Sequence, residues 1–179
     1  MSIPKKHEYL LVDGYNIIYA WDDLARTAQD SLEDARRELA HILTEYAAMT
    51  KRRVILVYDA HNVKRGTGNI ERLGGVQIVY TREAETADHY IERAASRLAR
   101  EYEVRVATSD ILEQVIILSR GAYRITADEF WDEVVSVKAQ VREMSAKLKP
   151  IKRNMLMDNL DERTAEQLEK MRRGKGRSK

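Results

Sequence analysis

Cysteine is absent from this chain of 179 residues. Its absence excludes disulfide bonds and thiolate metal sites, and it is compatible with a reducing compartment. The sequence also has no apolar run near the roughly 18 residues that a membrane span requires, and no apolar segment of signal-peptide length at its N-terminus. We therefore expect a cytoplasmic protein without a membrane partner.

Two nucleotide-binding motifs are also missing. No Gly-x-x-x-x-Gly-Lys-Ser/Thr loop is present, which argues against a P-loop NTPase. The segment Gly66–Glu71 begins like a dinucleotide-binding fingerprint but lacks the third glycine. It also follows its strand by several residues instead of opening a helix, so we discount it.

The net charge of +2 is unevenly distributed along the chain. From Lys147 to the C-terminus the sequence has eleven Lys or Arg and five Asp or Glu residues, so that segment carries +6 and the remainder −4. This pattern indicates an acidic body followed by a basic tail. We predict one domain over residues 1–149 and a tail, residues 150–179, that is partly helical or disordered.

Short apolar runs alternate with amphipathic stretches along the body. The apolar runs predict strands at 9–12, 54–58, 76–80, 104–107 and 123–125. The periodic stretches predict helices at 32–50, 86–101, 111–120 and 127–149. Strands that alternate with helices predict an α/β protein with a parallel sheet covered on both faces.

Capping residues and a proline predict where these helices begin and end. Asp30 with Glu33 resembles an N-terminal capping arrangement, and Thr126 with Glu129 forms a capping box. Pro150 is expected to end the last helix. A polar stretch, Trp21–Asp30, precedes the first long helix, and residues 60–75 are expected to form a glycine-rich loop.

Carboxylates stand at the ends of the predicted strands. Asp13, Asp59 and Asp110 each follow a strand, while Glu85 and Asp88 open a helix. Aspartate is also common in turns and helix caps, so no single one of these residues points to a site. In a parallel sheet, however, all of them lie on the same edge, where their repulsion is relieved if a cation binds. Oxygen ligands without cysteine or clustered histidine favour Mg²⁺ or Mn²⁺.

An acidic pocket repels a nucleic-acid backbone, so a nucleic-acid substrate would require basic residues nearby. The candidates for this role lie in or after the glycine-rich loop and are Lys64, Arg65, Arg72 and Arg82. Tyr15 follows the first strand and is a candidate to stack on an unpaired base. The alternative interpretations are a solvated loop and a tyrosine at the edge of the core.

The motifs resemble those of a known family. Their order and spacing are similar to those of the NYN-domain nucleases, a branch of the PIN-like superfamily. The segments that carry this resemblance are Asp13–Asn16, Tyr58–Asp59, Glu85–Asp88 and Thr108–Asp110. The glycine-rich loop, Val79–Arg82 and Glu113–Gln114 resemble the YacP-like subgroup in particular. The resemblance covers about residues 9–148.

The resemblance implies a PIN-like three-layer α/β/α sandwich with strand order 3-2-1-4-5. It implies a metal-dependent endoribonuclease that uses Mg²⁺ or Mn²⁺. Because YacP-like proteins are associated with translation, it also implies messenger RNA as substrate and the ribosome as a partner. The sequence leaves the oligomeric state open.

Residue roles follow from the same resemblance. Asp13, Asp88 and Asp110 match the metal-binding acids, and Asn16 matches the polar residue that orients the first acid or the substrate. Asp59 is a further ligand or a neighbour of the ligands. Glu85 and Ser109 are assigned auxiliary roles.

Two other functions are compatible with the same fold. The first is a module that binds RNA or the ribosome without cutting it. The second is another metal-dependent phosphohydrolase. A haloacid-dehalogenase enzyme needs a second aspartate two residues after the first, and Tyr15 occupies that position.

Overall fold

The computed structural model describes residues 7–59, 68–82, 84–109 and 121–158, of which residues 147–158 are described in the backbone only. The chain divides into two compact units, residues 1–138 and 139–179. The first unit contains the sheet and the candidate site. The predicted helix at 111–120 and the loop segment at 60–67 lie outside the described residues.

The sheet is built around β1 (Glu8–Asp13), which pairs in parallel with β2 (Arg53–Tyr58) and with β5 (Glu103–Ala107). Beyond β2 lies β4 (Val76–Tyr80), and beyond β5 lies β6 (Tyr123–Ile125), both parallel to their neighbours. The order β4-β2-β1-β5-β6 confirms the prediction for these strands. Residues 54–58 are buried, as expected for a strand covered on both faces.

One strand was not expected. Residues Ile70–Leu73, predicted to lie in a loop, form β3, which pairs antiparallel with β4 at the edge of the sheet. All of its side chains are exposed, so it shows no alternation of buried and exposed residues by which a sequence pattern identifies a strand. The turn at Gly74 and Gly75, which joins β3 to β4, is the sequence feature that could have predicted this hairpin.

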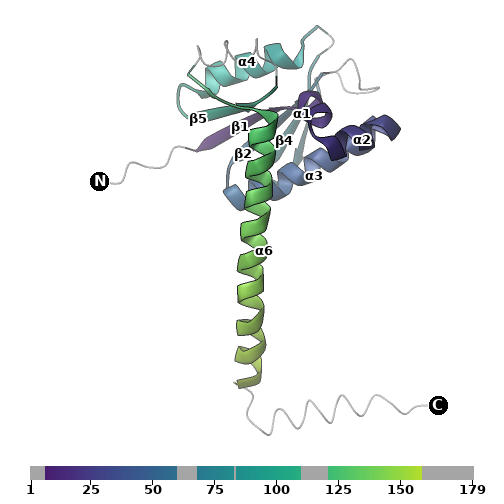
Figure 1. Ribbon diagram of the computed structural model, residues 1–179. Coiled ribbons are helices and arrows are strands. Elements are labelled where there is room, and N and C mark those ends of the chain that lie inside the picture. The colour runs from purple at the N-terminus through teal and green to yellow at the C-terminus, as the bar shows by residue number, and fades with distance from the viewer. Residues whose placement is uncertain (1–6, 60–67, 83, 110–120, 159–179) are drawn as a thin grey trace, which may run out of the picture. The chain divides into compact units, whose positions relative to one another are not determined.

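Helices cover both faces of the sheet, which confirms the three-layer α/β/α prediction (Figure 1). On one face lie α1 (Gly14–Ala20), α2 (Asp22–Asp30), α3 (Leu32–Thr50) and the first turns of α6 (Ala127–Asp158). On the other lies α4 (Ala87–Leu98). Within the described part of the chain, no helix combines the length and apolar character needed to cross a bilayer.

Several helix limits differ from the predicted ones. The polar stretch before α3 is itself the helix α2, whose sequence has a single large apolar residue, the buried Leu24. The cap of α3 is Ser31, whose hydroxyl accepts the N–H of Asp34 at 3.2 Å, and not Asp30. Pro150 does not end α6, which continues to Asp158. A proline removes one helical hydrogen bond and disfavours a helix without always ending it.

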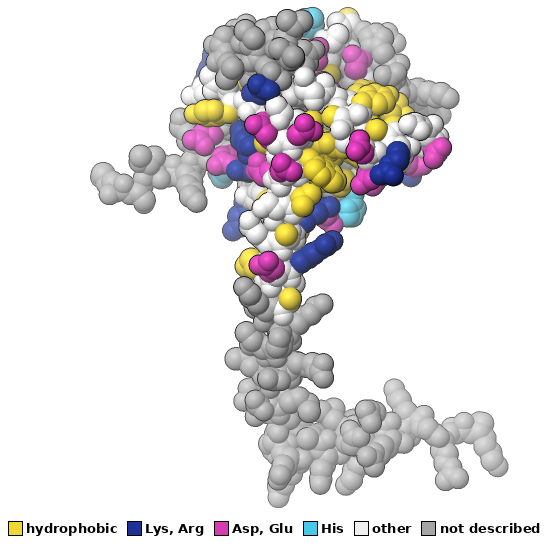
Figure 2. All heavy atoms as spheres, viewed as in Figure 1, with side chains coloured by type: hydrophobic (Ala, Val, Ile, Leu, Met, Phe, Trp, Pro, Cys, Tyr) yellow, Lys and Arg dark blue, Asp and Glu magenta, His cyan; other side chains and the backbone are white. Residues whose placement is uncertain are grey.

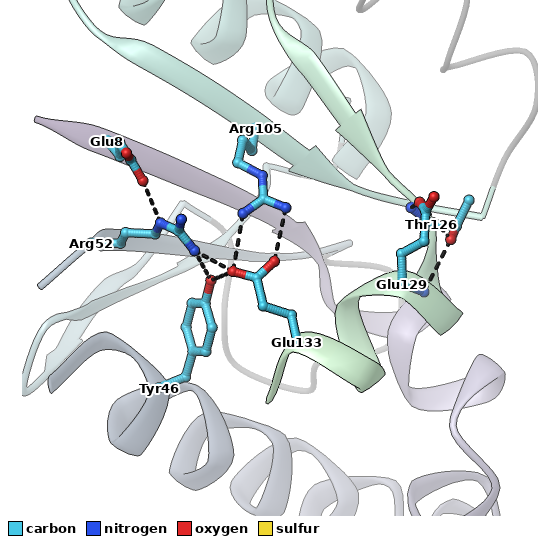
Figure 3. Close-up of polar contacts among 7 residues, drawn as sticks. All are labelled: Glu8, Tyr46, Arg52, Arg105, Thr126, Glu129 and Glu133. Carbon is cyan, nitrogen blue, oxygen red and sulfur yellow. Dashed lines mark hydrogen bonds and ion pairs between the residues drawn. The ribbon is translucent and has the colours of Figure 1, made fainter. Parts of the chain in front are cut away.

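The start of α6 was predicted correctly. The N–H of Thr126 donates to a carboxylate oxygen of Glu129 at 2.8 Å, and the N–H of Glu129 donates to the Thr126 hydroxyl at 3.1 Å (Figure 3). This reciprocal pair is a capping box, and it satisfies two donors that the first helical turn leaves free. Phe130 and Val134 then bury the apolar side of the first turns in the core.

A polar cluster joins α6 to the amino-terminal edge of the sheet (Figure 3). Arg105 of β5 donates two hydrogen bonds to the Glu133 carboxylate, at 3.1 and 2.8 Å. The Tyr46 hydroxyl of α3 donates to the same carboxylate at 2.7 Å, and Arg52, which precedes β2, pairs with both Glu133 and Glu8. Burial opposes ionisation of Glu133, but these donors outweigh it and lower its pKa to about 2.

This cluster makes stability depend on acid pH. Glu133→Gln is expected to lower the free energy of unfolding at neutral pH by roughly 1–3 kcal/mol, because it leaves two arginines without their shared partner. Since the pKa of Glu133 falls from 4.5 to about 2 on folding, the contribution is present above 4.5 and fades as pH drops toward 2. Urea unfolding at neutral and acid pH measures it.

The matched control is Glu103→Gln, an exposed glutamate at the start of β5, which should change stability little at either pH. A deficit of Glu133→Gln that stays constant from neutral to acid pH would contradict the assignment of the low pKa to Glu133.

Candidate functional site

Asp13 stands where β1 passes into α1 and is 8% exposed. Its carboxylate accepts the backbone N–H of Asn16 at 3.1 Å and so caps α1. Burial raises its pKa, the hydrogen bond from Asn16 opposes the rise, and the charges of Asp88 and Asp59 add to it, giving a pKa of about 6. Asp13 is thus a buried acid that two other acids repel.

Asp59 and Asp88 approach Asp13 from neighbouring elements. Asp59 follows β2 directly and is half-buried, while Asp88 is exposed in the first turn of α4. Thr86 caps that helix by accepting the N–H of His89 at 3.3 Å. The structure therefore brings three of the predicted acids close enough for their charges to interact.

These acids do not by themselves form a complete metal centre. In the described segments, no three His, Cys, Asp or Glu side chains converge closely enough to hold a metal ion. Asp110 lies outside the described residues. Metal binding by Asp13, Asp59, Asp88 and Asp110 therefore stays a prediction.

Asn16 links Asp13 at the end of β1 to Ser109 beyond the end of β5. Its side-chain oxygen accepts the backbone N–H of Ser109 at 2.7 Å, although the two residues are far apart in the sequence. Thr108, which precedes Ser109, is fully buried at the end of β5. The first turn of α1 is therefore tied to the backbone that follows β5, and the predicted roles of Asn16 and Ser109 stay predictions.

Glu85 is engaged away from Asp13. Its carboxylate forms an ion pair with Arg93 of α4, and its N–H donates to the carbonyl oxygen of Arg82 at 2.8 Å. Its negative charge is thus compensated by a residue of the helix that carries Asp88. This arrangement supports an auxiliary role that positions the start of α4.

Tyr15 lies in a cluster of aromatic rings beside Asp13. Its ring centroid is 5.1 Å from that of Tyr58, which in turn lies 5.7 Å from that of Tyr80. The Arg36 guanidinium of α3 donates to the Tyr15 hydroxyl at 3.0 Å. Tyr15 is therefore held in place and half-buried, and no sequence pattern indicated the contact with Arg36.

Gly14 explains how α1 packs against this cluster. A Cβ atom at position 14 would lie 2.2 Å from the Tyr58 ring, closer than any side chain allows. The missing side chain lets the first turn of α1 approach the end of β2, which brings Asp13 toward Asp59.

The predicted RNA-binding bases are only partly described. Arg72 is exposed on β3. Arg82 is also exposed and packs beside Gly68, because a Cβ atom added at Gly68 would lie 3.3 Å from the Arg82 side chain. Lys64 and Arg65 lie outside the described residues. Their approach to RNA is untested.

A mostly parallel sheet between two helical layers, with three interacting acids at the carboxyl ends of its strands, defines an α/β protein with an acidic candidate site. The comparisons with known proteins make the class specific. The sequence profile of the YacP-like NYN domain matches residues 10–173, and the chain belongs to this family. The match extends beyond residues 9–148, which carry the motifs.

The relatives come from Bacillus subtilis. The chain is 39% identical over 142 residues to a protein of strain 168 named "Uncharacterized protein YacP", covering 79% of this chain and 83% of the relative. It is similar to the crystal structure of Rae1 (YacP), with a TM-score of 0.68 at 36% identity over 93% of this chain and 95% of that one. The crystal structure of a Rae1 point mutant gives the same TM-score at 38% identity, covering 80% and 84%.

The raised pKa of Asp13 predicts an effect on stability. Because the folded protein holds this proton more tightly than the unfolded chain, stability falls as pH rises from 3.8 through about 6. Without divalent ions, Asp13→Asn should therefore be more stable than the wild type at neutral pH by roughly 2–3 kcal/mol. Asparagine also keeps the cap of α1.

Urea unfolding in EDTA measures this gain, with Asp22→Asn as an exposed control in the first turn of α2. The gain of Asp13→Asn should vanish in acid, where the wild-type carboxyl is protonated. An Asp13→Asn variant that is less stable than the wild type at neutral pH would show that Asp13 is not destabilised by burial.

The hydrogen bond between Asn16 and Ser109 predicts a local effect. Asn16→Ala removes the acceptor, so the Ser109 amide should exchange with deuterium about 5- to 10-fold faster. Asn16→Asp keeps an acceptor and should preserve the protection. The Tyr90 amide, which donates to Thr86 within α4, serves as the internal reference and should not change. Equal exchange at Ser109 in Asn16→Ala and wild type would disprove the connection.

Proposed function

We propose that this protein is a metal-dependent endoribonuclease whose active site is built on Asp13, Asp88 and Asp110. Family membership supports a nuclease-type domain. The observation that carries the proposal is the buried Asp13 carboxylate, which is coupled to Asp88 and Asp59 and has a pKa of about 6. Repulsion among these acids lowers the stability of the fold. A role in binding a cation or a substrate is therefore the better explanation for their proximity.

The donors present fit Mg²⁺ or Mn²⁺. Asp13, Asp59 and Asp88 offer hard carboxylate oxygens, and the repulsion on Asp13 is of the kind that a divalent cation relieves. Asp13, Asp88 and Asp110 would hold the ion, with Asp59 beside them. When bound, such an ion supplies Lewis-acid stabilisation of phosphate charge and lowers the pKa of water.

The chain's own residues prepare this chemistry. Asp13 is fixed by its bond to the Asn16 N–H, and Asn16 fixes Ser109, which sets the backbone before Asp110. Glu85, paired with Arg93, holds the turn that leads into Asp88. In the proposed reaction, water attacks the phosphorus and the P–O3′ bond breaks, so the products would be a 3′-hydroxyl and a 5′-phosphate. The RNA 2′-hydroxyl takes no part, so no cyclic phosphate forms.

The proposed substrate is messenger RNA in the context of translation, with the ribosome as the presenting partner. Tyr15 and the bases Arg72, Arg82, Lys64 and Arg65 are proposed to contact the RNA. The second candidate is a module that binds RNA or the ribosome without cutting. It requires no ionised Asp13, and the crowding of three acids makes it the weaker candidate.

The proposal is tested with Asp88→Asn. We expect wild-type protein with Mg²⁺ or Mn²⁺ to make discrete cuts in a messenger that is translated in a purified system, and Asp88→Asn to lose at least about 100-fold in rate, as expected when an oxyanion or metal contact is removed. The control is Asp128→Asn, an exposed aspartate in the first turn of α6, which should cut like the wild type.

Naked RNA in parallel reactions distinguishes the contexts. Cuts only during translation support the ribosome as a partner, and cuts in both settings support a free ribonuclease. Products with a cyclic 2′,3′-phosphate would contradict the proposed chemistry. Folded wild-type protein that binds RNA or ribosomes but cuts in neither setting would favour the binding module.

A further inference from the structure

The side of α4 that faces away from the sheet carries several basic side chains. Ala87, Ile91 and Ala95 are buried and define the inner side of the helix. At 100° per residue, the opposite side is occupied by the exposed residues His89, Arg93 and Arg97, with the half-buried Ser96 among them and the half-buried Glu92 at its border. The exposed Arg100 follows two residues after the helix ends. We call His89, Arg93, Arg97 and Arg100 the α4 basic row.

The helices on the other face of the sheet neutralise their own charges. Arg37 of α3 pairs with Glu33 at 2.7 Å and with Asp34 at 3.0 Å, and Arg26 of α2 pairs with Asp23. Figure 2 shows basic and acidic side chains intermixed on the side of the molecule where α2 and α3 lie. Exposed charge on these helices is therefore balanced locally.

The α4 basic row lacks this balance. Arg93 pairs with Glu85, but for Arg97 and Arg100 the described part of the chain contains no ion-pair partner. Arg93 and Arg97 are one turn apart, about 6 Å along the helix axis, and Arg100 follows just beyond the end of the helix, so the row presents neighbouring positive charges. Because the body of the chain is acidic overall, this local excess of positive charge suggests that the row binds a negatively charged partner.

The row also has a defined position relative to the candidate site. It belongs to the helix whose first turn holds Asp88, and Arg93 pairs with Glu85 just before that turn. A strand with its scissile phosphate near Asp88 can therefore continue along α4 toward its C-terminal end. Guanidinium groups bind phosphate through paired hydrogen bonds, and a phosphate backbone has the opposite charge in a repeating line.

We infer that the α4 basic row binds the phosphate backbone of the RNA that flanks the cleavage position, with Arg97 and Arg100 as the main contacts. The inference rests on the proposed function, since it places the substrate of that same site. It predicts binding without base specificity, because phosphate contacts position a strand without reading its sequence.

The test compares two double variants of the full chain that change total charge equally. Arg97→Gln with Arg100→Gln removes the proposed phosphate contacts. Arg26→Gln with Arg37→Gln removes two exposed arginines from α2 and α3 and is the matched control. Affinity for a labelled single-stranded RNA is measured in EDTA over a range of salt concentrations, and thermal melting verifies that both variants are folded.

We expect the Arg97→Gln, Arg100→Gln variant to bind about 10- to 30-fold more weakly near 0.1 M salt, with the slope of log affinity against log salt reduced by about 1.4. The control should keep the wild-type slope. Equal losses in both variants, or no loss in the first, would overturn the inference. Wild-type binding to poly-glutamate that the first variant abolishes, with RNA affinity unchanged, would assign the row to an acidic protein and overturn it too.

The outcome can be separated from that of the proposed function. If wild type cuts RNA and Asp88→Asn does not, while the first double variant binds RNA like the wild type, only the inference about α4 fails. If wild type neither binds nor cuts RNA, the proposed function fails, and the inference fails with it.

Discussion

The parallel pairing of β1 with both β2 and β5 is the constraint on which the rest of the molecule depends. Parallel strands begin at one edge of a sheet and end at the other, so each strand's last residue meets those of its neighbours. Asp13, Asp59 and Ser109 come together for this reason, although helices and other strands separate them in the sequence. Antiparallel pairing would have sent them to opposite edges.

The two edges of this sheet have opposite electrostatic character. At the amino-terminal edge, Glu133 is surrounded by donors that lower its pKa to about 2, so its charge is stabilised by the fold. At the carboxyl-terminal edge, burial and like charges raise the pKa of Asp13 to about 6, so its charge is opposed by the fold. One edge holds α6 to the sheet, and the other crowds acids together, where the proposed cation would relieve their repulsion.

Much of this arrangement could be predicted from the sequence because its signals are local. Val54–Tyr58, the buried part of β2, is an unbroken apolar run, and Thr126 with Glu129 has the spacing of a capping box. The helix α2 and the strand β3 were missed because their sequences have few buried apolar residues: Leu24 is the one buried residue of α2, and β3 buries no side chain. The bond from Arg36 to Tyr15 depends on how two helices pack, which no local pattern encodes.

The double role of Asp13 has a consequence for how sequences of this kind change with time. The same carboxylate caps α1 and stands in the crowded acidic edge, and asparagine can fulfil the first role but not the second. A lineage that no longer needs the acidic edge would gain by replacing aspartate with asparagine, and a single nucleotide change converts one codon into the other. Asparagine at this position would therefore keep the cap of α1 alone, whereas aspartate serves both the cap and the proposed acidic site.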